Sequence, residues 1–187
     1  MPIRDSIQNC FRELVISTPY EKITVTSLCR RVNISRAAFY DHFNSKDAIL
    51  FSLVEHDLYM PNHQMMQSIP TRKLKSAPQI LMEMIYQTIQ RNSLFYLKLN
   101  RIDKGRLLIA TLTELFSALN DNVLADFDLP EDEKRYSAFF FAVSDAHLIS
   151  KWLDNGMDVA PARLAQLYNK WTLRYWFDVN PEKMGWM

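Results

Sequence analysis

Apolar residues near the start of the chain recur with the period of an α-helix. Ile7, Phe11 and Leu14 are four and three residues apart, so they share one face of a helix. Pro19 cannot continue this helix, because it has no backbone N–H group and its ring clashes with the preceding turn. The pattern therefore predicts a first helix over residues 3–17.

Two short helices and a longer one are predicted to follow. Residues 26–32 carry apolar positions four apart, and the next residue, Asn33, is of a type that tolerates the left-handed backbone of a tight turn. Ser35 is a good N-cap for a third helix that runs to about residue 43. Ser45 has the same role for a fourth helix, which is expected to extend into the mid-60s.

The rest of the sequence is also patterned as helices, after a loop predicted at residues 68–78. A break is expected near Asn92. Gly156 is typical of the end of a helix, and Pro161 is suited to the first turn of the next one. The predicted helices span residues 79–99, 105–126, 131–155 and 161–177.

This pattern predicts an all-α protein of about nine helices. We expect a three-helix domain at residues 1–44, a larger helical domain at residues 45–177 and a tail at residues 178–187. The composition agrees, because 48% hydrophobic residues are enough to bury a core. The three glycines are too few and too far apart for the glycine-rich loops of dinucleotide-binding and phosphate-binding folds.

The distribution of charge is more informative than its total. The whole chain carries a net charge of +1, but residues 22–40 hold four basic and no acidic residues. The remaining residues therefore carry −3, the difference between +1 and +4. The basic stretch covers two short helices joined by a tight turn, which is the layout of a helix-turn-helix. It favours docking on phosphates, although an ordinary solvated basic helix has the same charge.

Residues 23–50 read ITVTSLCRRVNISRAAFYDHFNSKDAIL and hold many distinctive positions in a fixed register. The most informative are Ile34-Ser35-Arg36, Phe39-Tyr40, His42-Phe43 and Ser45-Lys46-Asp47. Together they closely resemble the N-terminal DNA-binding segment of the TetR family of transcriptional regulators. The chain departs from the common family pattern at Asn33, which is often Gly, and at Ala37-Ala38, which are often Gly-Thr.

The resemblance implies a homodimeric, sequence-specific transcriptional regulator, usually a repressor, without catalytic residues, metal or cofactor. Its implied partner is double-stranded DNA with a palindromic operator, and each subunit places residues 35–42 in a major groove. Arg36 is expected at a base edge or a phosphate, Tyr40 and Lys46 at phosphates, while Thr26 is equally suited to capping a helix. The expected DNA-binding residues are Thr24, Thr26, Ser35, Arg36, Ala37, Tyr40, His42 and Lys46.

Residues 139–171 resemble, more loosely, the last two helices of a subgroup of the same family, which usually pair with their copies in a second subunit. The predicted helix at residues 131–155 is apolar nearly all round, so it must be buried from several directions. A homodimer through residues 131–177 achieves this as a four-helix bundle; a monomer that covers both faces itself is the alternative. The expected interface residues are Phe139, Ala142, Ala146, Ile149, Leu153, Leu164, Tyr168, Trp171 and Tyr175.

Methionine and aromatic residues are frequent in the middle of the chain. Methionine adapts to irregular apolar ligands, so these residues are candidates to line an effector cavity, which the family usually has. A filled helical core has the same composition, and a protein effector then becomes the better hypothesis than a small apolar one. The expected pocket residues are Met60, Met82, Tyr86, Phe95, Tyr96, Phe116 and Phe140.

Other functions have less support in the sequence. The second hypothesis is a helical sensor or adaptor module without DNA binding, which salt-dependent binding to duplex DNA would distinguish. An enzyme is the third, because Asp145 and His147 point away from each other on one helix. No apolar run reaches the roughly 18 residues of a membrane span, and the two cysteines read as reduced thiols, so we expect a cytoplasmic protein with no membrane partner.

Overall fold

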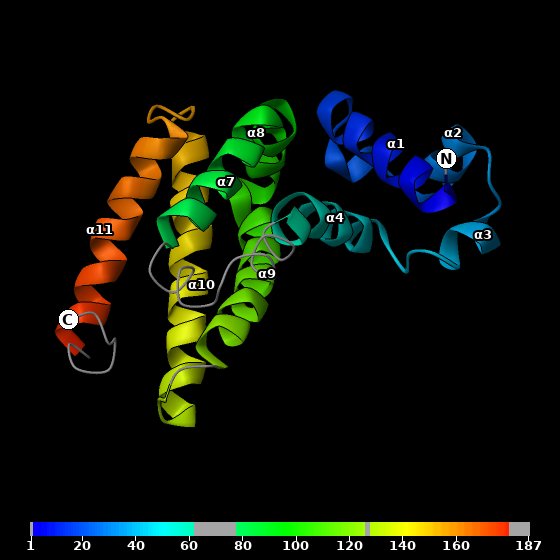
Figure 1. Ribbon diagram of the computed structural model, residues 1–187. Coiled ribbons are helices and arrows are strands. Elements are labelled where there is room, and N and C mark those ends of the chain that lie inside the picture. The colour runs from blue at the N-terminus through cyan, green and yellow to red at the C-terminus, as the bar shows by residue number, and fades with distance from the viewer. Residues whose placement is uncertain (1, 62–77, 126–127, 180–187) are drawn as a thin grey trace.

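The computed structural model describes residues 2–61, 78–125 and 128–179 (Figure 1). Every regular element within these ranges is helical, which confirms the predicted all-α fold. In chain order the elements are α1 (Ile3–Ser17), a 3-10 turn (Tyr20–Lys22), α2 (Val25–Val32), α3 (Arg36–Tyr40), α4 (Lys46–Val54), a π-helical turn (Glu55–Tyr59), α7 (Pro78–Arg91), α8 (Ser93–Arg101), a 3-10 turn (Ile102–Gly105), α9 (Arg106–Ala125), α10 (Glu131–Asp154) and α11 (Pro161–Val179).

Helices α1, α2 and α3 form a small unit at one end of the molecule, which we call the head (right-hand side of Figure 1). Its core contains Ile7, Phe11, Leu28 and Phe39, all fully buried, with Phe43 beside them. Burying an apolar side chain of this size contributes about 1.5–3 kcal/mol. Ile7 and Phe11 belong to the apolar face predicted for the first helix, so the sequence pattern and the packing agree there.

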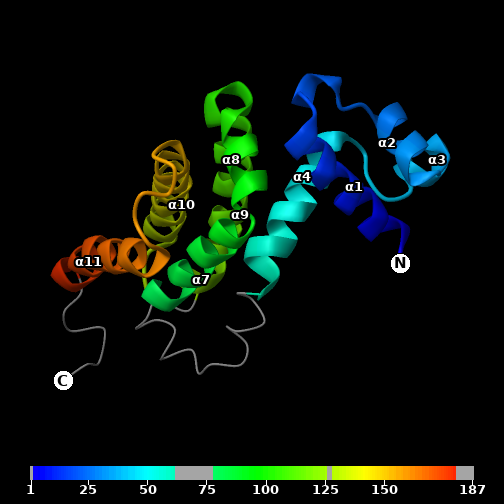
Figure 2. The same cartoon turned by 90° about the horizontal axis from the view of Figure 1, so that it is seen from above.

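Helices α7 to α11 form the larger part of the molecule, which we call the body (Figures 1 and 2). The long helices α9 and α10 pack along each other, and α11 packs on α7. The core of the body is aromatic: Tyr86, Phe95, Tyr96 and Phe116 are each no more than 2% exposed. The edge of Trp152 packs against Tyr86, with ring centroids 5.6 Å apart. The described helices of the body therefore share an aromatic core.

Proline, glycine and asparagine residues end the helices where the sequence pattern predicts. Helix α1 ends before Pro19, and Asn92 separates α7 from α8. Gly156 follows the end of α10 with a left-handed φ of 71°, a conformation that favours glycine. Pro161 begins α11, which continues to Val179, so the first two residues of the predicted tail are helical. Residues 180–187 lie outside the described residues.

Two predicted helices differ from those in the structure. Helix α3 ends at Tyr40 rather than near residue 43, because the chain leaves the helix in a turn that returns Phe43 to the core. The fourth helix changes after Val54 into a π-helical turn. Such turns are rare in proteins, and those that occur often lie at functional sites. Its predicted extension into the mid-60s and most of the predicted loop at residues 68–78 fall outside the described residues.

Helix α4 connects the head to the body. It contacts α1 of the head and α9 of the body, and α1 itself also contacts α8. Figure 2 shows α4 running from beside α1 towards α7. The head therefore has a packed junction with the body rather than a free tether. The domain boundary between residues 44 and 45 stays a prediction.

Candidate DNA-binding surface

The turn between α2 and α3 is built from the residues that the sequence marked. Asn33 takes the left-handed conformation, with φ 58° and ψ 51°, and the Ile34 N–H donates to the Cys29 carbonyl at 3.0 Å. The Ser35 hydroxyl then accepts from the Ala38 N–H at 3.0 Å and caps α3. These local bonds fix the direction in which α3 leaves the turn.

Helix α3 turns one side to the core and the other to solvent. Phe39 is fully buried, whereas Arg36, Ala37 and Tyr40 are exposed. Arg36 and Tyr40 are one helical turn apart, and Arg36 Nη2 donates to the Tyr40 hydroxyl at 3.4 Å. The outer side of α3 therefore presents a guanidinium beside a phenol. Both groups donate hydrogen bonds, which base edges and phosphate oxygens accept.

Thr24, rather than Thr26, caps α2. The Thr24 Oγ1 accepts from the Ser27 N–H at 3.1 Å, and the Ser27 hydroxyl oxygen accepts from the Thr24 N–H at 3.0 Å. This reciprocal pair satisfies two backbone donors at the start of the helix. Thr26 is exposed on the first turn of α2. The capping role considered for Thr26 is thus corrected, because Thr24 precedes the first helical residue and Thr26 does not.

Lys46 is positioned by the residues just after α1. Its Nζ donates to the Tyr20 carbonyl at 2.9 Å and lies 3.9 Å from the centroid of the Tyr20 ring. The Tyr20 hydroxyl donates in turn to Asp47. An ammonium group has three donors, so this anchoring leaves others for a phosphate. His42 is half-buried, and its backbone carbonyl accepts from Arg4 Nη1 at 3.4 Å.

Two further basic residues of the head are exposed, and the sequence reasoning included them only in the local charge. Lys22 follows α1, and Arg30 lies in the last turn of α2. Arg31 is also exposed, but its Nη2 forms an ion pair with Glu13 at 3.2 Å. Lys22 and Arg30 add exposed positive charge to the head outside α3, and the charge run at residues 22–40 was the signal that pointed to them.

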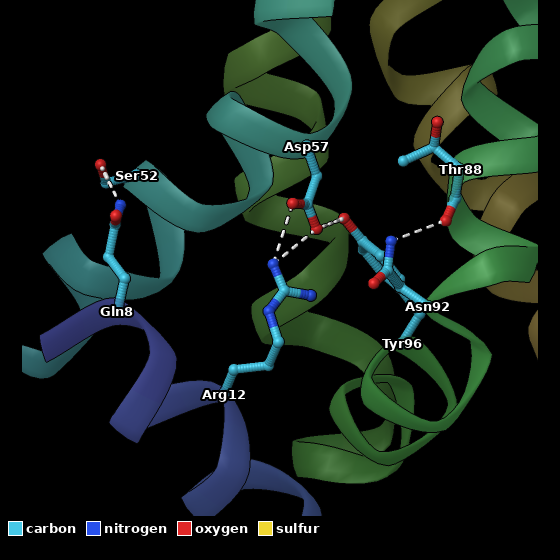
Figure 3. A network of polar contacts seen from close by, with 7 residues as sticks. All are labelled: Gln8, Arg12, Ser52, Asp57, Thr88, Asn92 and Tyr96. Atoms are coloured by element: carbon cyan, nitrogen blue, oxygen red, sulfur yellow. Dashed lines mark hydrogen bonds and ion pairs between the residues drawn. The ribbon is translucent and has the colours of Figure 1, made fainter. Parts of the chain in front are cut away.

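A polar junction joins the head to the body (Figure 3). Arg12 of α1 donates from Nη2 to both carboxylate oxygens of Asp57 at 2.9 Å. The fully buried Tyr96 of α8 donates from its hydroxyl to Asp57 Oδ2 at 3.0 Å. Burial and the charge of Asp57 raise the pKa of Tyr96, so its hydroxyl stays a donor. The Arg12 guanidinium also lies 4.6 Å from the centroid of the Phe95 ring.

Sequence comparisons identify the family. A profile described as "Bacterial regulatory proteins, tetR family" matches residues 12–53. A second profile, described as "Transcriptional regulator C-terminal region", matches residues 76–172, more than half of the chain. The chain belongs to the TetR family. This TetR-family protein is therefore a DNA-binding transcriptional regulator. A search of the curated proteins finds no significant match.

Solved structures show the same fold across nearly the whole length of this TetR-family chain. One is a dihydroxyacetone kinase operon activator, DhaS, with a TM-score of 0.61 and 18% identity, covering 92% of this chain and 95% of the other. Another is NalD, the secondary repressor of the MexAB-OprM multidrug efflux pump in Pseudomonas aeruginosa, with a TM-score of 0.59, 16% identity and coverage of 92% and 96%. A third is the fatty acid degradation regulator FadR from Bacillus halodurans, with a TM-score of 0.52, 15% identity and coverage of 91% and 94%.

Five of the seven residues expected around an effector cavity lie together in the core of this TetR-family fold, and two lie on its surface. Met82, Tyr86, Phe95, Tyr96 and Phe116 are at most 5% exposed and fill the core of the body. Met60 and Phe140 are 41% and 60% exposed, on the last described turn after α4 and on the outer side of α10. The seven residues therefore divide between core and surface. The amino-acid composition could not predict which of these residues are buried and which are exposed, because apolar residues occupy both positions.

The residues expected at a subunit interface also divide, and most of them are covered within the chain. Ala142, Ala146, Ile149, Leu153 and Leu164 are at most 4% exposed. Tyr168 is half-buried, with its hydroxyl 3.4 Å from Asp145 Oδ2. Only Phe139 and Trp171, at 59% and 53% exposure, are open to a partner, and the side chain of Tyr175 lies outside the description. The expected face of α10 packs against the chain's own helices, which corrects its assignment to a second subunit.

A different side of α10 is open. Tyr136, Phe139 and Phe140 are 59–67% exposed in the first half of the helix. They lie within four residues of one another, so their side chains share the outward side of the helix. From the sequence, Phe139 was assigned to the interface and Phe140 to the effector cavity, and these residues were not brought together. Large aromatic residues in such a group are typical of protein–protein contacts.

Proposed function

We propose that this TetR-family regulator is a homodimer that binds a palindromic operator and represses transcription until an effector binds to the body. The observation that carries the DNA-binding part is the outer side of α3, where Arg36 and Tyr40 stand exposed on a helix capped by Ser35. In helix-turn-helix proteins the second helix enters the major groove, and its N-terminal residues contact base edges. Arg36 is the first residue of α3.

Each exposed group of the head has a role in this proposal. Arg36 donates to a guanine edge or a phosphate, and the methyl group of Ala37 is free to contact a thymine methyl. Tyr40 and Lys46 donate to phosphates, which fixes the register of α3 in the groove without reading sequence. Lys22 and Arg30 add charge that attracts the duplex. All residues outside 22–40 together carry a net charge of −3, so the positive charge of the chain is concentrated in the head.

The dimer is proposed through the open side of α10. TetR-family regulators are generally dimeric, and Tyr136, Phe139 and Phe140 give this chain an exposed aromatic surface. Trp171 on α11 adds a further exposed aromatic side chain. A two-fold axis brings the same surface of each copy together, and a stable interface buries about 1,200 Å² or more in total. Two heads related by this axis read half-sites about 34 Å apart or a multiple of that.

Repression with release by an effector is the regulatory part of the proposal. The solved structures with this fold include a protein described as an activator and one described as a repressor, so the fold is compatible with either sign. The junction of Arg12, Asp57 and Tyr96 supports effector control, because it links the body directly to the first helix of the head.

A regulator of this kind acts on DNA in the cytoplasm. Among the helices in the described ranges, none is sufficiently long and apolar to cross a bilayer.

Selection of duplexes from a random library tests this function. The full chain is expected to enrich a palindromic sequence, and cleavage protection should show two half-sites in successive major grooves. Enrichment of a single, non-repeated half-site would contradict the homodimer. A chain that enriches nothing, and whose weak binding does not change with salt concentration, would favour the adaptor without DNA binding instead.

A further inference from the structure

A pocket opens beside the junction between head and body. It has a volume of about 360 Å³, which is within the range of about 300–1,000 Å³ found for small-molecule sites. The π-helical turn supplies one wall, Pro61 borders it, and α7 supplies the facing wall. The lining residues that matter here are His56, Asp57, Pro61, Met84, Thr88 and Arg91. Apart from Met84, one of the methionines of the middle region, none of them belongs to the cavity that the aromatic and methionine content predicted.

The lining combines unpaired basic groups with an apolar surface. Among the described residues, the side chains of His56 and Arg91 have no hydrogen-bond or ion-pair partner. Asp57 also lines the pocket, but its charge is compensated by Arg12. Met84 and Pro61 supply the apolar part. An unpaired guanidinium is the group that proteins use most effectively to hold a carboxylate, because two parallel N–H groups match its two oxygens.

We propose that this pocket binds a small amphipathic carboxylate and that the bound anion releases the contact between Arg12 and Asp57. The carboxylate lies at Arg91, with His56 and the Thr88 hydroxyl near it, and the apolar tail lies against Met84 and Pro61. This inference rests on the proposed effector control and gives it a site and a ligand class.

The release follows from the position of Asp57, which belongs to the pocket and to the junction at once. Its two oxygens accept from Arg12, and Oδ2 also accepts from Tyr96 (Figure 3). A second anion in the pocket repels the Asp57 carboxylate and attracts Arg12, whose side chain is 22% exposed. Both effects weaken the bond that holds α1 to the π-helical turn, and the head then changes its position relative to the body.

Anion binding and the bond between Arg12 and Asp57 must affect each other equally, by thermodynamic linkage. If the anion weakens the bond between Arg12 and Asp57, then removing that bond must strengthen binding of the anion by the same factor. The substitution Asp57→Asn removes both the bond and the like charge in the pocket. It is therefore expected to bind the anion several-fold more tightly than the wild type. Tyr96→Phe removes only the hydroxyl donor, leaves the charge in place and provides a milder variant should Asp57→Asn fail to fold.

The first test measures binding by titration calorimetry on the full chain, with octanoate as the probe. Octanoate is expected to bind, and 1-octanol, which has the same tail without the charge, to bind at least tenfold more weakly. Arg91→Gln should weaken octanoate about tenfold or more, whereas Arg101→Gln, at an exposed position at the end of α8, should leave it unchanged. Absence of octanoate binding, equal binding by Arg91→Gln, or equal binding of 1-octanol would overturn the proposed site.

The second test follows the head in solution. Donor and acceptor dyes are attached to Ala37→Cys in α3 and Ser144→Cys in α10, both exposed, while the native Cys10 and Cys29 are buried. Labelled chain is mixed with an excess of unlabelled chain, so energy transfer reports a distance within one subunit. Octanoate should change the transfer efficiency in the wild type. Asp57→Asn should show the changed value without octanoate, and Tyr96→Phe should respond to lower octanoate concentrations.

The outcomes of these tests distinguish a failure of the proposed anion site from a failure of the proposed effector control of DNA binding. Bound octanoate with unchanged energy transfer, or wild-type behaviour of both junction variants, would overturn the release of Arg12. Neither test contains DNA, so their results do not depend on operator binding. If octanoate moves the head but leaves affinity for the selected duplex unchanged, the proposed effector control fails while the site and the movement stand.

Discussion

Tyr40 is the residue whose contribution to DNA binding can be isolated by removing a single atom. It is 46% exposed, and its ring packs edge-on against the buried Phe39, so Tyr40→Phe keeps the packing and removes only the hydroxyl. We expect DNA binding to weaken by about 1.5–3 kcal/mol, the value of a hydrogen bond to a charged group. The loss should be similar on every duplex, because a phosphate contact carries no base information.

Fluorescence anisotropy with labelled duplexes measures this effect. Arg163→Ala provides the control, because Arg163 is exposed but lies on α11, outside the head. Wild-type affinity for Tyr40→Phe, or a loss confined to one sequence, would count against the phosphate contact.

Asp145 is a buried carboxyl group whose charge costs stability. Burial raises the pKa of Asp145 to about 8, although the Tyr168 hydroxyl opposes the shift. In the unfolded chain an aspartate has a pKa of about 3.9. Between these two values the unfolded state has released the proton and the folded state has kept it. The contribution of Asp145 to stability is therefore fully present below about pH 4 and is lost as the pH rises towards 8, by up to about 1.4 kcal/mol per unit.

Asp145→Asn removes this titration. The free energy of unfolding of the variant, relative to the wild type, is expected to increase between pH 5 and pH 7.5 in urea denaturation. Asp132→Asn, at an exposed carboxylate in the first turn of the same helix, should show a difference that does not change with pH. A constant difference for Asp145→Asn as well would show that the folded protein holds Asp145 ionised.

Single residues were predictable from the sequence where their role is local. The turn residue Asn33 and the cap Ser35 act on backbone groups within a few positions, so their residue types revealed them. The bond between Arg12 and Asp57 joins residues 45 positions apart. No short-range pattern marks one as the partner of the other, because only the docking of α1 on the π-helical turn brings them together.

At the scale of elements, the cap of α2 decides how firmly the helix-turn-helix begins. Thr24→Ala removes the acceptor for the Ser27 N–H and is expected to lower the free energy of unfolding by about 0.5–2 kcal/mol. Thr26→Ala, two residues later on the exposed first turn, should change it by less than about 0.5 kcal/mol. Urea denaturation of both variants makes the comparison. Equal effects, or a larger one at Thr26, would contradict the assignment of the cap.

Helix positions were largely predictable, whereas the faces of α10 were not. Pro19, Asn92, Gly156 and Pro161 end or begin helices through local backbone preferences, and the structure agrees at each. Helix α10 is apolar nearly all round, so its sequence alone cannot say which side meets α9 and which side remains open. Packing decides that. It buries Ala142 and Ala146 within the chain and leaves Tyr136, Phe139 and Phe140 exposed.

At the scale of the whole molecule, the open side of α10 predicts how the dimer can be broken without unfolding the subunit. Phe140 is 60% exposed in the single chain, so Phe140→Glu places a charge where only a partner would bury it. We expect sedimentation velocity to show a dimer for the wild type at tens of micromolar and a folded monomer for Phe140→Glu. The monomer should bind the palindrome poorly, because it has lost the second head.

Two further variants distinguish the interface from the core. Leu94→Glu alters an equally exposed apolar residue on α8, at 55% exposure, and should leave the dimer intact. Ala146→Glu puts the charge at a fully buried position and should unfold the subunit rather than release it. A wild-type monomer at tens of micromolar would defeat the proposed dimer, and with it the reading of two half-sites.

The central claim is that α3 reads DNA through Arg36. Fluorescence anisotropy with the palindromic duplex enriched from the random library tests this claim most directly. Wild type, Arg36→Ala and the control Arg163→Ala, at an exposed arginine of α11, are titrated against that duplex and against single-base variants of one half-site. Arg36→Ala is predicted to lose about 1–3 kcal/mol of binding and to lose discrimination at one base pair, while Arg163→Ala behaves as the wild type. If Arg36→Ala binds all duplexes with the affinity and the discrimination of the wild type, α3 does not read DNA through Arg36.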